Sequence, residues 1–475
     1  MATIGIPLAT CADQTLARLA AATGSNSLAK LDGETLLGER ALLAGMRIPG
    51  RTSAGGGCRL FDAVGGAVAL NLSRPVDREL LPALFATDDL DADDHDDIAA
   101  RMAQNDAAAL VVRGRLMGLA IASEREALLS RARAGAAVGV GVGREACGGR
   151  GARAGRDIGG RAAWERAGAS ADVGVDTRRA GRDIIVERTA NGDAVAGAGV
   201  GRAACGAHLP DACVELVPGL TAATPARHAP RVVDLSALWA GPLAAHLLWL
   251  AGAEVIKVES RTRPDAMRNG NNTFYALLNQ GKASVALDFR NDRERQALLS
   301  LITSSDIVIE AARPRALAQL GIDAAQIVRE TPGLVWVSIT AHGATGEAAN
   351  WVGFGDDCGV SGGLSAALRA TTGRSGFVGD AIADPLTGMW AALVAWEAWV
   401  SRRGGRLGVA MSQVVAHCLA TGRAQYPREL ESSLTAWSEA AGMPFPTVNR
   451  RSIGPLPAFG AHTQSYLRRR TRGEP

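Results

Sequence analysis

An aspartate stands directly before a long apolar segment in the C-terminal half of the chain. In ADPLTGMW, Asp384 is followed by Pro385, and the residues from there to Val400 are mostly apolar. Asp is favoured as a helix N-cap and Pro at the first helical position, so the pattern predicts a helix over Pro385–Val400 with Asp384 as its N-cap. Helix N–H groups would keep this carboxyl ionised, and a carboxylate can act as a nucleophile. A plain N-cap, stabilising the helix by about 1 kcal/mol, is the alternative.

A second candidate site lies in VVDLSALWAGPLAAHLLWLAGAEVIKVES, residues 232–260. The segment is typical of a strand, a tight turn, an apolar helix and a second strand, which together form a βαβ unit. In such units the turn and the start of the helix lie where α/β sheets bind phosphate-bearing ligands. Leu238, Trp239 and Ala240 occupy this turn.

Strands alternate with helices from Arg231 onward. The predicted strands are residues 232–236, 254–259, 284–289, 306–311 and 334–340, and predicted helices cover residues 292–303 and 314–322. This alternation predicts an α/β fold with a doubly wound, parallel, Rossmann-like sheet. We expect this Rossmann-like domain at residues 226–425 and a C-terminal tail segment at 426–475.

The N-terminal part predicts a smaller α+β domain over residues 1–130. A hairpin is expected within residues 57–72, helices are expected within 97–119, and the acidic run Asp88–Asp97 is predicted to lie at a helix N-terminus. Residues 131–225 are rich in Arg, Gly and Ala and lack apolar periodicity, so they predict a disordered linker. The sequence leaves open whether this stretch is a true linker or a coding artefact.

Composition excludes several classes of function. The net charge is +3, and lysine occurs only at positions 30, 257 and 282, so nothing predicts nucleic-acid binding. The seven cysteines have no metal-ligand spacing and no closed disulfide set, and no metal site is predicted. The N-terminus lacks the pattern of a signal peptide and the apolar runs are too short to span a bilayer. We therefore expect a cytoplasmic protein without membrane association.

Several segments, taken in order, resemble the family III CoA-transferases, the group that includes formyl-CoA and carnitine CoA-transferases and α-methylacyl-CoA racemase. They are VVDLSALWAGP, AGAEVIKVE, LNQGKASVALDF, DIVIEAARPRALAQLGI, LVWVSITAHGATG, FGDDCGVSGGL, GDAIADPLTGMW and GRLGVAMSQVVAHCLA. Each segment alone is a weak signal. Their shared order from Val232 to about residue 420 makes the resemblance specific.

The resemblance implies roles for individual residues. Asp384 falls at the position of the family's catalytic aspartate, and Asp356, Asp357 and Asp380 are the nearby alternatives. The resemblance also implies contacts with coenzyme A, which we expect from Leu238, Trp239, Ala240, Arg261 and Lys282.

The segment GRTSAGGGCRLFDAVGGAVALNL resembles the family's glycine-loop region. Gly55, Gly56 and Gly57 would form a mobile loop that covers the aspartyl intermediate, and a plain hairpin turn is the alternative. In ordinary relatives this segment follows the catalytic aspartate, whereas here it precedes the βα region. The resemblance therefore implies a permuted segment order or a fusion of two incomplete units.

The implied activity is transfer of CoA between carboxylic acids through an aspartyl mixed anhydride and an aspartyl-CoA thioester. Acyl-CoA, CoA and carboxylic acids would be substrates, no tightly bound cofactor is expected, and a homodimer is expected because relatives form one. One alternative is an acyl-CoA racemase, which needs a histidine base; the racemase histidine position falls near Gly353, and no histidine lies between His342 and His417. The other is a CoA-binding subunit without catalytic activity.

Overall fold

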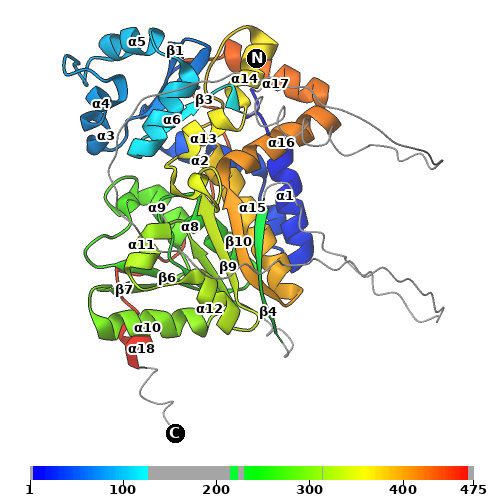
Figure 1. Cartoon of the computed structure of the whole chain (residues 1–475). Coiled ribbons are helices and arrows are strands. Elements are labelled where there is room, and N and C mark those ends of the chain that lie inside the picture. The colour runs from blue at the N-terminus through cyan, green and yellow to red at the C-terminus, as the bar shows by residue number, and fades with distance from the viewer. Residues whose placement is uncertain (1–3, 127–213, 223–228, 313, 469–475) are drawn as a thin grey trace, which may run out of the picture. The chain divides into compact units, whose positions relative to one another are not determined.

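The computed structural model describes residues 4–126, 214–222, 229–312 and 314–468, all within one unit formed by Met1–Ala136 and Ala207–Pro475 (Figure 1). Most of the predicted linker, residues 131–225, lies outside the described residues. The fold combines a large and a small β-sheet with helices around each.

The large sheet has seven strands in the order β4-β10-β9-β8-β5-β6-β7. Their bounds are β4 Val214–Thr221, β5 Arg231–Asp234, β6 Glu254–Ser260, β7 Ala283–Leu287, β8 Ile307–Glu310, β9 Val335–Thr340 and β10 Arg403–Ala410. All neighbouring pairs are parallel except β4 with β10. The chain runs outward from β5 through β6 to β7, then returns to β8 beside β5 and runs outward on the other side. This doubly wound order puts the topological switch point between β5 and β8, where open α/β sheets bind ligands.

Helices cover both faces of this sheet, which explains why most residues of its parallel strands are buried. Val232 and Val233 are both fully buried, yet they contribute to two different cores because successive side chains point to opposite faces. On one face lie α8 Ala240–Leu250 and α15 Ala383–Val400, and α1 Ala9–Thr23 packs on α15. The other core includes residues of α10 Asp292–Thr303, α11 Pro314–Gln319 and α12 Ala324–Glu330.

The N-terminal part of the chain contains the antiparallel sheet β1-β2-β3. The strands are β1 Cys58–Ala63, β2 Gly66–Asn71 and β3 Ala120–Ser123, packed with α3 Pro75–Glu79, α4 Leu81–Phe85, α5 His95–Ala103 and α6 Ala107–Met117. The predicted hairpin and helices are confirmed. The acidic run does lie at a helix N-terminus, since Asp94 is the N-cap of α5 and its carboxylate accepts from Asp96 N. The pattern did not predict β3.

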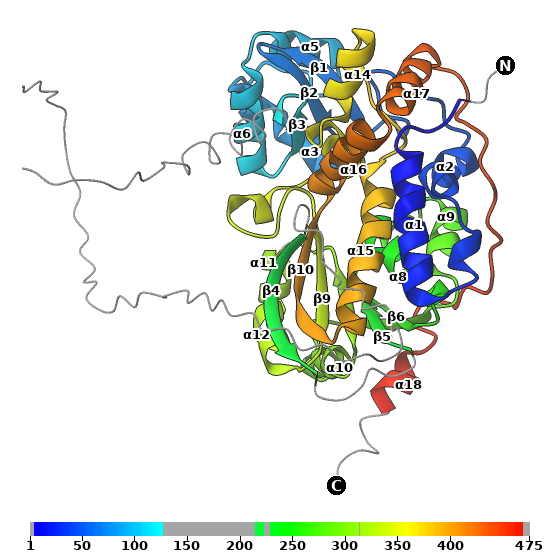
Figure 2. The same cartoon turned by 90° about the vertical axis from the view of Figure 1, so that its right-hand side faces the viewer.

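The remaining elements connect and cover these two parts. They are α2 Gly33–Leu43, α9 Asn272–Asn279, α13 Gly355–Ser361, α14 Leu364–Thr372, α16 Met411–Gln425, α17 Pro427–Glu439 and α18 Thr463–Arg468, with 3-10 turns at Leu28–Lys30, Ala266–Arg268 and Glu347–Asn350. After α17 the chain crosses to the far edge of the sheet (Figure 2), where Ser284 N donates to His462 Nδ1 at 3.1 Å.

The predicted linker extends too far at its C-terminal end. Residues 214–221 form β4, which pairs antiparallel with β10 from Val409 to Arg403. An edge strand gets its hydrogen bonds from one neighbour, so its formation depends on β10, nearly 200 residues away in sequence. The local composition therefore did not predict it.

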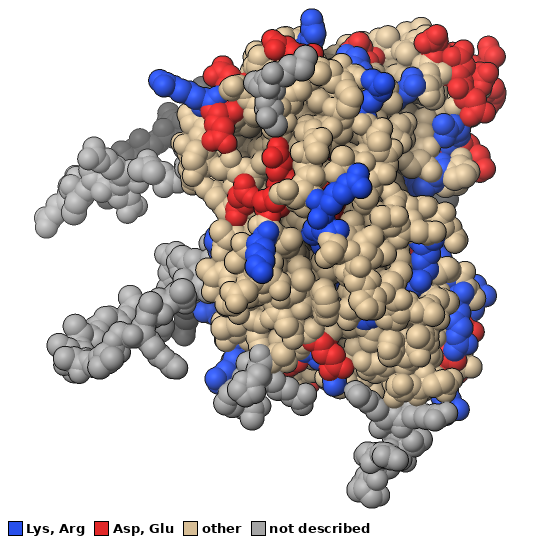
Figure 3. Space-filling view, turned by 180° about the vertical axis from the view of Figure 1, so that it is seen from behind, with Lys and Arg blue, Asp and Glu red and all other residues tan. Residues whose placement is uncertain are grey.

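On the face that Figure 3 shows, basic and acidic side chains of the described residues are interspersed, with one acidic cluster at the upper right edge. This face has no broad basic surface of the kind that nucleic acids need. Within the described part of the chain, no helix combines the length and apolarity needed to cross a membrane.

Candidate functional site

The turn between β5 and α8 is held in place by buried charges. Lys257 Nζ donates to Ser236 O at 2.9 Å and pairs with Asp265 at 3.2 Å, and Asp265 in turn accepts from Leu238 N at 3.2 Å. Leu238 has φ 67° and remains 39% exposed. A leucine with positive φ is strained, and such strain persists only where its surroundings enforce it. The turn between β5 and α8 is thus rigid, and it partly exposes the apolar side chain of Leu238 at the switch point.

Lys282 belongs to the same supporting network. Its Nζ donates to Asp234 Oδ2 at 2.8 Å, to Pro242 O at 2.8 Å and to Asn279 Oδ1 at 3.0 Å. An ammonium group has three N–H donors, and here all three are used within a buried site. The predicted CoA contact of Lys282 therefore needs correction, because no donor is left for a ligand in this structure. Burial alone would raise the pKa of Asp234, but Lys282 and Lys257 outweigh it and lower that pKa.

Arg261 lies on the surface after β6. Its side chain is 45% exposed and pairs with Glu294, and Nε donates to Ala286 O at 3.3 Å. These surface contacts leave the guanidinium accessible, so its contact with CoA stays a prediction. Exposed pairs of this kind contribute little to stability.

Asp384 is not the N-cap of its helix. α15 begins at Ala383, its N-cap is Ile382, and Asp384 N donates to Ala381 O at 2.9 Å. The helix starts earlier than predicted because Asp356 Oδ1 accepts from Ala381 N at 3.0 Å and fixes the preceding turn. The half-buried Asp384 carboxyl instead accepts from the backbone N–H of Ala240. The N-terminus of α8 therefore stabilises the ionised carboxylate, which also lies in the first turn of α15.

Two further carboxylates and one arginine surround Asp384. Asp380 is fully buried and pairs with Arg40, whose Nε lies 2.8 Å from Oδ2 while Nη2 contacts Oδ1. Asp356 accepts from Ala381 N and from the Ser53 hydroxyl. We call Asp356, Asp380, Asp384 and Arg40 the carboxylate cluster. Sequence reasoning named its three aspartates but missed Arg40, which is 340 residues away from its partner.

The cluster raises the pKa of two of its carboxyls. Burial is the main cause for Asp384, the negative charge of Asp356 adds to it, and Arg40 opposes it; the resulting pKa is about 7. Burial and the charge of Asp380 raise the pKa of Asp356 to about 6. Asp384 therefore gains a proton just below neutral pH. Perturbed carboxyls gathered at one place are typical of functional sites.

Gly355 allows the Asp384 carboxyl to lie where it does. A Cβ atom at this position would be 2.3 Å from Asp384 Oδ2 and 2.3 Å from Ala381 O, closer than any real contact. No sequence signal marked this glycine, since it depends on a carboxyl 29 residues later in the chain.

We expect Gly355→Ala to displace the Asp384 carboxyl and to lower kcat by about 10²-fold, because a shift of about 1 Å in a reacting group costs that much. Steady-state kinetics and thermal unfolding would be measured together. Gly50→Ala is the matched control, since nothing lies within 4 Å of its added Cβ. Equal losses of activity in both variants would contradict this role of Gly355.

The predicted glycine loop lies beside the carboxylate cluster. Gly56 N donates to Ser53 O at 2.9 Å, and a Cβ on Gly55 would be 3.7 Å from Arg40 Nη2. Gly56 has φ 77°, which favours glycine, and a Cβ on Gly57 would be 2.2 Å from Ser73 Oγ, so the Ser73 hydroxyl would have to shift. Whether the loop moves as a lid stays a prediction.

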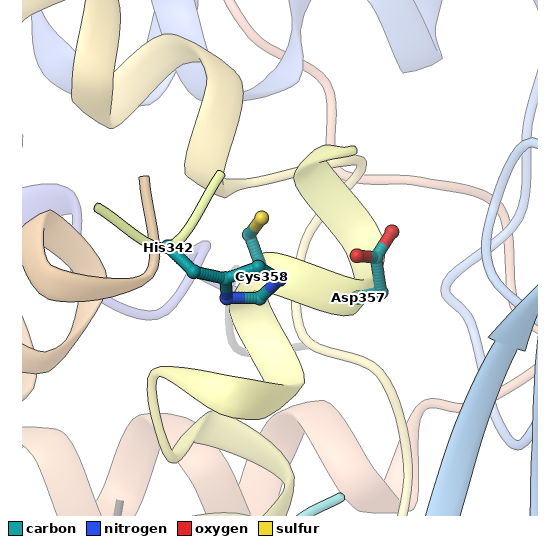
Figure 4. A group of neighbouring side chains, drawn as sticks. All are labelled: His342, Asp357 and Cys358. Carbon is teal, nitrogen blue, oxygen red and sulfur yellow. The ribbon is translucent and has the colours of Figure 1, made fainter. Parts of the chain in front are cut away.

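A third group of buried side chains lies next to this cluster. His342, Asp357 and Cys358 place their nitrogen, oxygen and sulfur atoms within 4.8 Å of one another; Asp357 and Cys358 come from α13, and His342 follows β9 (Figure 4). The residue types fit a metal ion. However, Arg115 Nη2 lies 3.4 Å from His342 Nε2 and Ser361 Oγ lies 3.3 Å from Nδ1. Because a guanidinium beside the histidine repels a cation, we assign no metal here.

The strand order and the charged site at the switch point define a doubly wound α/β protein with a half-buried carboxyl of raised pKa. Residues 229–439 match the sequence model of CoA-transferase family III. The resemblance seen in the sequence is therefore confirmed for this part of the chain.

Curated relatives show the same similarity. Succinyl-CoA–D-citramalate CoA-transferase of Chloroflexus aurantiacus is 31% identical over 180 residues, covering 36% of this chain and 45% of the relative. Formyl-CoA:oxalate CoA-transferase of Afipia carboxidovorans is 27% identical over 241 residues, covering 47% and 55%. The chain thus spans about half the length of the curated relatives it matches. A crystal structure of the hypothetical protein Rv3272 from Mycobacterium tuberculosis has 27% identity and a TM-score of 0.39, covering 43% of this chain and 61% of that one.

Proposed function

We propose that this protein transfers CoA between carboxylic acids and that Asp384 is its nucleophile. The observation that carries the proposal is the Asp384 carboxyl, half-buried at the N-terminus of α8 and next to the turn at Leu238–Ala240. Acyl-CoA and a carboxylic acid are the proposed substrates. Leu238, Trp239, Ala240 and Arg261 are the proposed contacts with CoA.

The chemistry proceeds in balanced steps. An Asp384 carboxylate oxygen attacks the thioester carbonyl of acyl-CoA, and the C–S bond breaks to give a mixed anhydride and CoA thiolate. The thiolate then attacks Asp384 Cγ and releases the original acid, which leaves an aspartyl-CoA thioester. The same steps in reverse with a second acid form the new acyl-CoA and restore the carboxylate.

The surrounding groups suit these steps. The Ala240 N–H already bonds to the Asp384 carboxyl. It can therefore stabilise negative charge that develops on the carboxyl oxygen of Asp384. The loop of Gly55, Gly56 and Gly57 would cover the intermediate and exclude water. Its place beside Arg40 supports a permuted segment order, since the loop precedes the sheet in sequence yet lies at the cluster. A homodimer and a cytoplasmic location remain predictions.

The pH profile should report the ionisation of Asp384. Because only the carboxylate attacks and its pKa is about 7, kcat/KM for acyl-CoA is expected to rise with pH, to be half-maximal near pH 7 and to level off about one pH unit higher. Asp356→Asn removes a negative charge that raises the pKa of Asp384. The acid limb should therefore move to lower pH, by about one unit. A profile unchanged by Asp356→Asn would contradict this coupling.

A direct assay tests the proposed function. The purified protein is incubated with one acyl-CoA and a panel of unlabelled carboxylic acids, and new acyl-CoA species are detected by mass spectrometry. Transfer predicts a new thioester for at least one acid. A racemase would instead exchange the substrate's α-hydrogen in deuterated water without forming new thioesters, and a binding subunit would do neither. His342 fits a racemase base poorly, since burial and Arg115 lower its pKa to about 3.

A further inference from the structure

Arg40 reaches the carboxylate cluster from the N-terminal part of the chain. It extends from α2, and its Nε and Nη2 both bind the fully buried Asp380. Its guanidinium carbon lies 4.8 Å from the centre of the Trp239 ring, within the range of a cation–π contact. Two hydrogen bonds and a ring contact therefore hold this side chain in one orientation.

One edge of the guanidinium remains available. Within the parts of the chain that the structure describes, Nη1 has no hydrogen-bond partner, and the side chain is 22% exposed. Nη1 carries two of the five N–H donors of an arginine. A fixed guanidinium with free donors next to a reacting carboxyl is suited to bind a second carboxylate.

We propose that Arg40 is the substrate-binding residue for the acid that accepts CoA, and that its Nη1 group binds one carboxylate oxygen of that acid. The other oxygen is then directed at Asp384 Cγ of the aspartyl-CoA thioester. There a C–O bond forms, the C–S bond breaks, and the electron pair leaves with CoA as the thiolate. This inference rests on the proposed function and extends it to the recognition of the second substrate.

The charge of the site favours this order of events. While Asp384 is a free carboxylate, three aspartates face one arginine and repel a further anion. Once Asp384 carries CoA it is uncharged, and the Arg40–Asp380 pair is neutral as a unit, so an incoming carboxylate meets much less repulsion. CoA phosphates are poorer candidates for Nη1, because the pantetheine arm separates them from the reacting sulfur.

The test separates acceptor binding from the first half of the reaction. We compare the wild type with Arg40→Met, Arg40→Lys and the double variant Arg40→Met/Asp380→Asn. The comparison is made at pH 9, where loss of the positive charge of Arg40 changes the ionisation of Asp384 least. The double variant also removes the fully buried Asp380 carboxylate that Arg40 pairs with, so it keeps the test valid if the single Met variant fails to fold. Arg51→Met is the matched control, since this arginine pairs with the exposed Asp62.

We expect the KM of the acceptor acid to rise by about 10- to 100-fold in the Met variants, which is the loss of a charge-assisted hydrogen bond. Aspartyl-CoA should still form from acyl-CoA alone, and added guanidinium ion should partly restore acceptor use. An unchanged acceptor KM, or an equal rise in the KM of acyl-CoA, would overturn the proposal. A wild-type enzyme that forms no aspartyl-CoA would instead refute the proposed function itself.

Discussion

Replacing Asp384 by Asn should lower the rate of CoA transfer by about 10⁴- to 10⁶-fold, the usual effect of removing a catalytic nucleophile. An amide has nearly the same shape as the carboxyl but does not form the anhydride. The fold should be retained, because burial already disfavours the ionised form and raises its pKa to about 7. At pH 8 the variant should therefore be as stable as the wild type, or more stable.

Steady-state transfer and thermal unfolding of Asp384→Asn would be measured at pH 8. Asp62→Asn serves as the control, because its side chain is 80% exposed and lies outside the carboxylate cluster. Transfer retained within tenfold of the wild type would exclude Asp384 as the nucleophile. Loss of activity together with a large loss of stability would leave its role as a nucleophile unsupported.

Replacing Lys282 by Met should reduce the free energy of unfolding by about 3–5 kcal/mol, since it leaves the buried Asp234 carboxylate without its partner. The lysine also bridges Pro242 O in α8 and Asn279 in α9, so both helices lose a contact. Folded Lys282→Met protein should bind acyl-CoA with a KM close to that of the wild type.

Denaturant unfolding of Lys282→Met, Asp234→Asn and the double variant measures this contribution. Because the two residues interact, the double variant should be less destabilised than the sum of the single variants. If Lys282→Met leaves the stability unchanged but strongly raises the KM for acyl-CoA, the result would support the CoA contact that the resemblance implied for Lys282.

The parallel sheet was predictable because its signal is local. Each strand of the β5–β9 region is short, rich in Val and Ile or Ala, and largely buried on both faces, and α10 begins and ends at the predicted residues Asp292 and Thr303. The edge strand β4 and the short β3 were not predictable in this way. Their pairing depends on partners distant in sequence, which a local pattern does not contain.

The same distinction applies to the site. Asp384 and the turn at Leu238–Ala240 stand out locally, as a carboxyl before an apolar helix and as a βα turn. Arg40 and Gly355 do not stand out in the sequence. Their roles arise only in the folded protein, where Arg40 pairs with Asp380 and Gly355 lies against Asp384. Lys282 was misjudged for a related reason: its rarity in the chain gave no indication of its buried partner Asp234.

The most direct measurement is to trap the covalent intermediate. The wild-type protein is mixed with acyl-CoA and treated with hydroxylamine or borohydride, and its peptides are then analysed by mass spectrometry. We predict a hydroxamate or a reduced side chain at Asp384, and none in the Asp384→Asn variant. Modification at another residue, or no modification under conditions where transfer proceeds, would contradict the account.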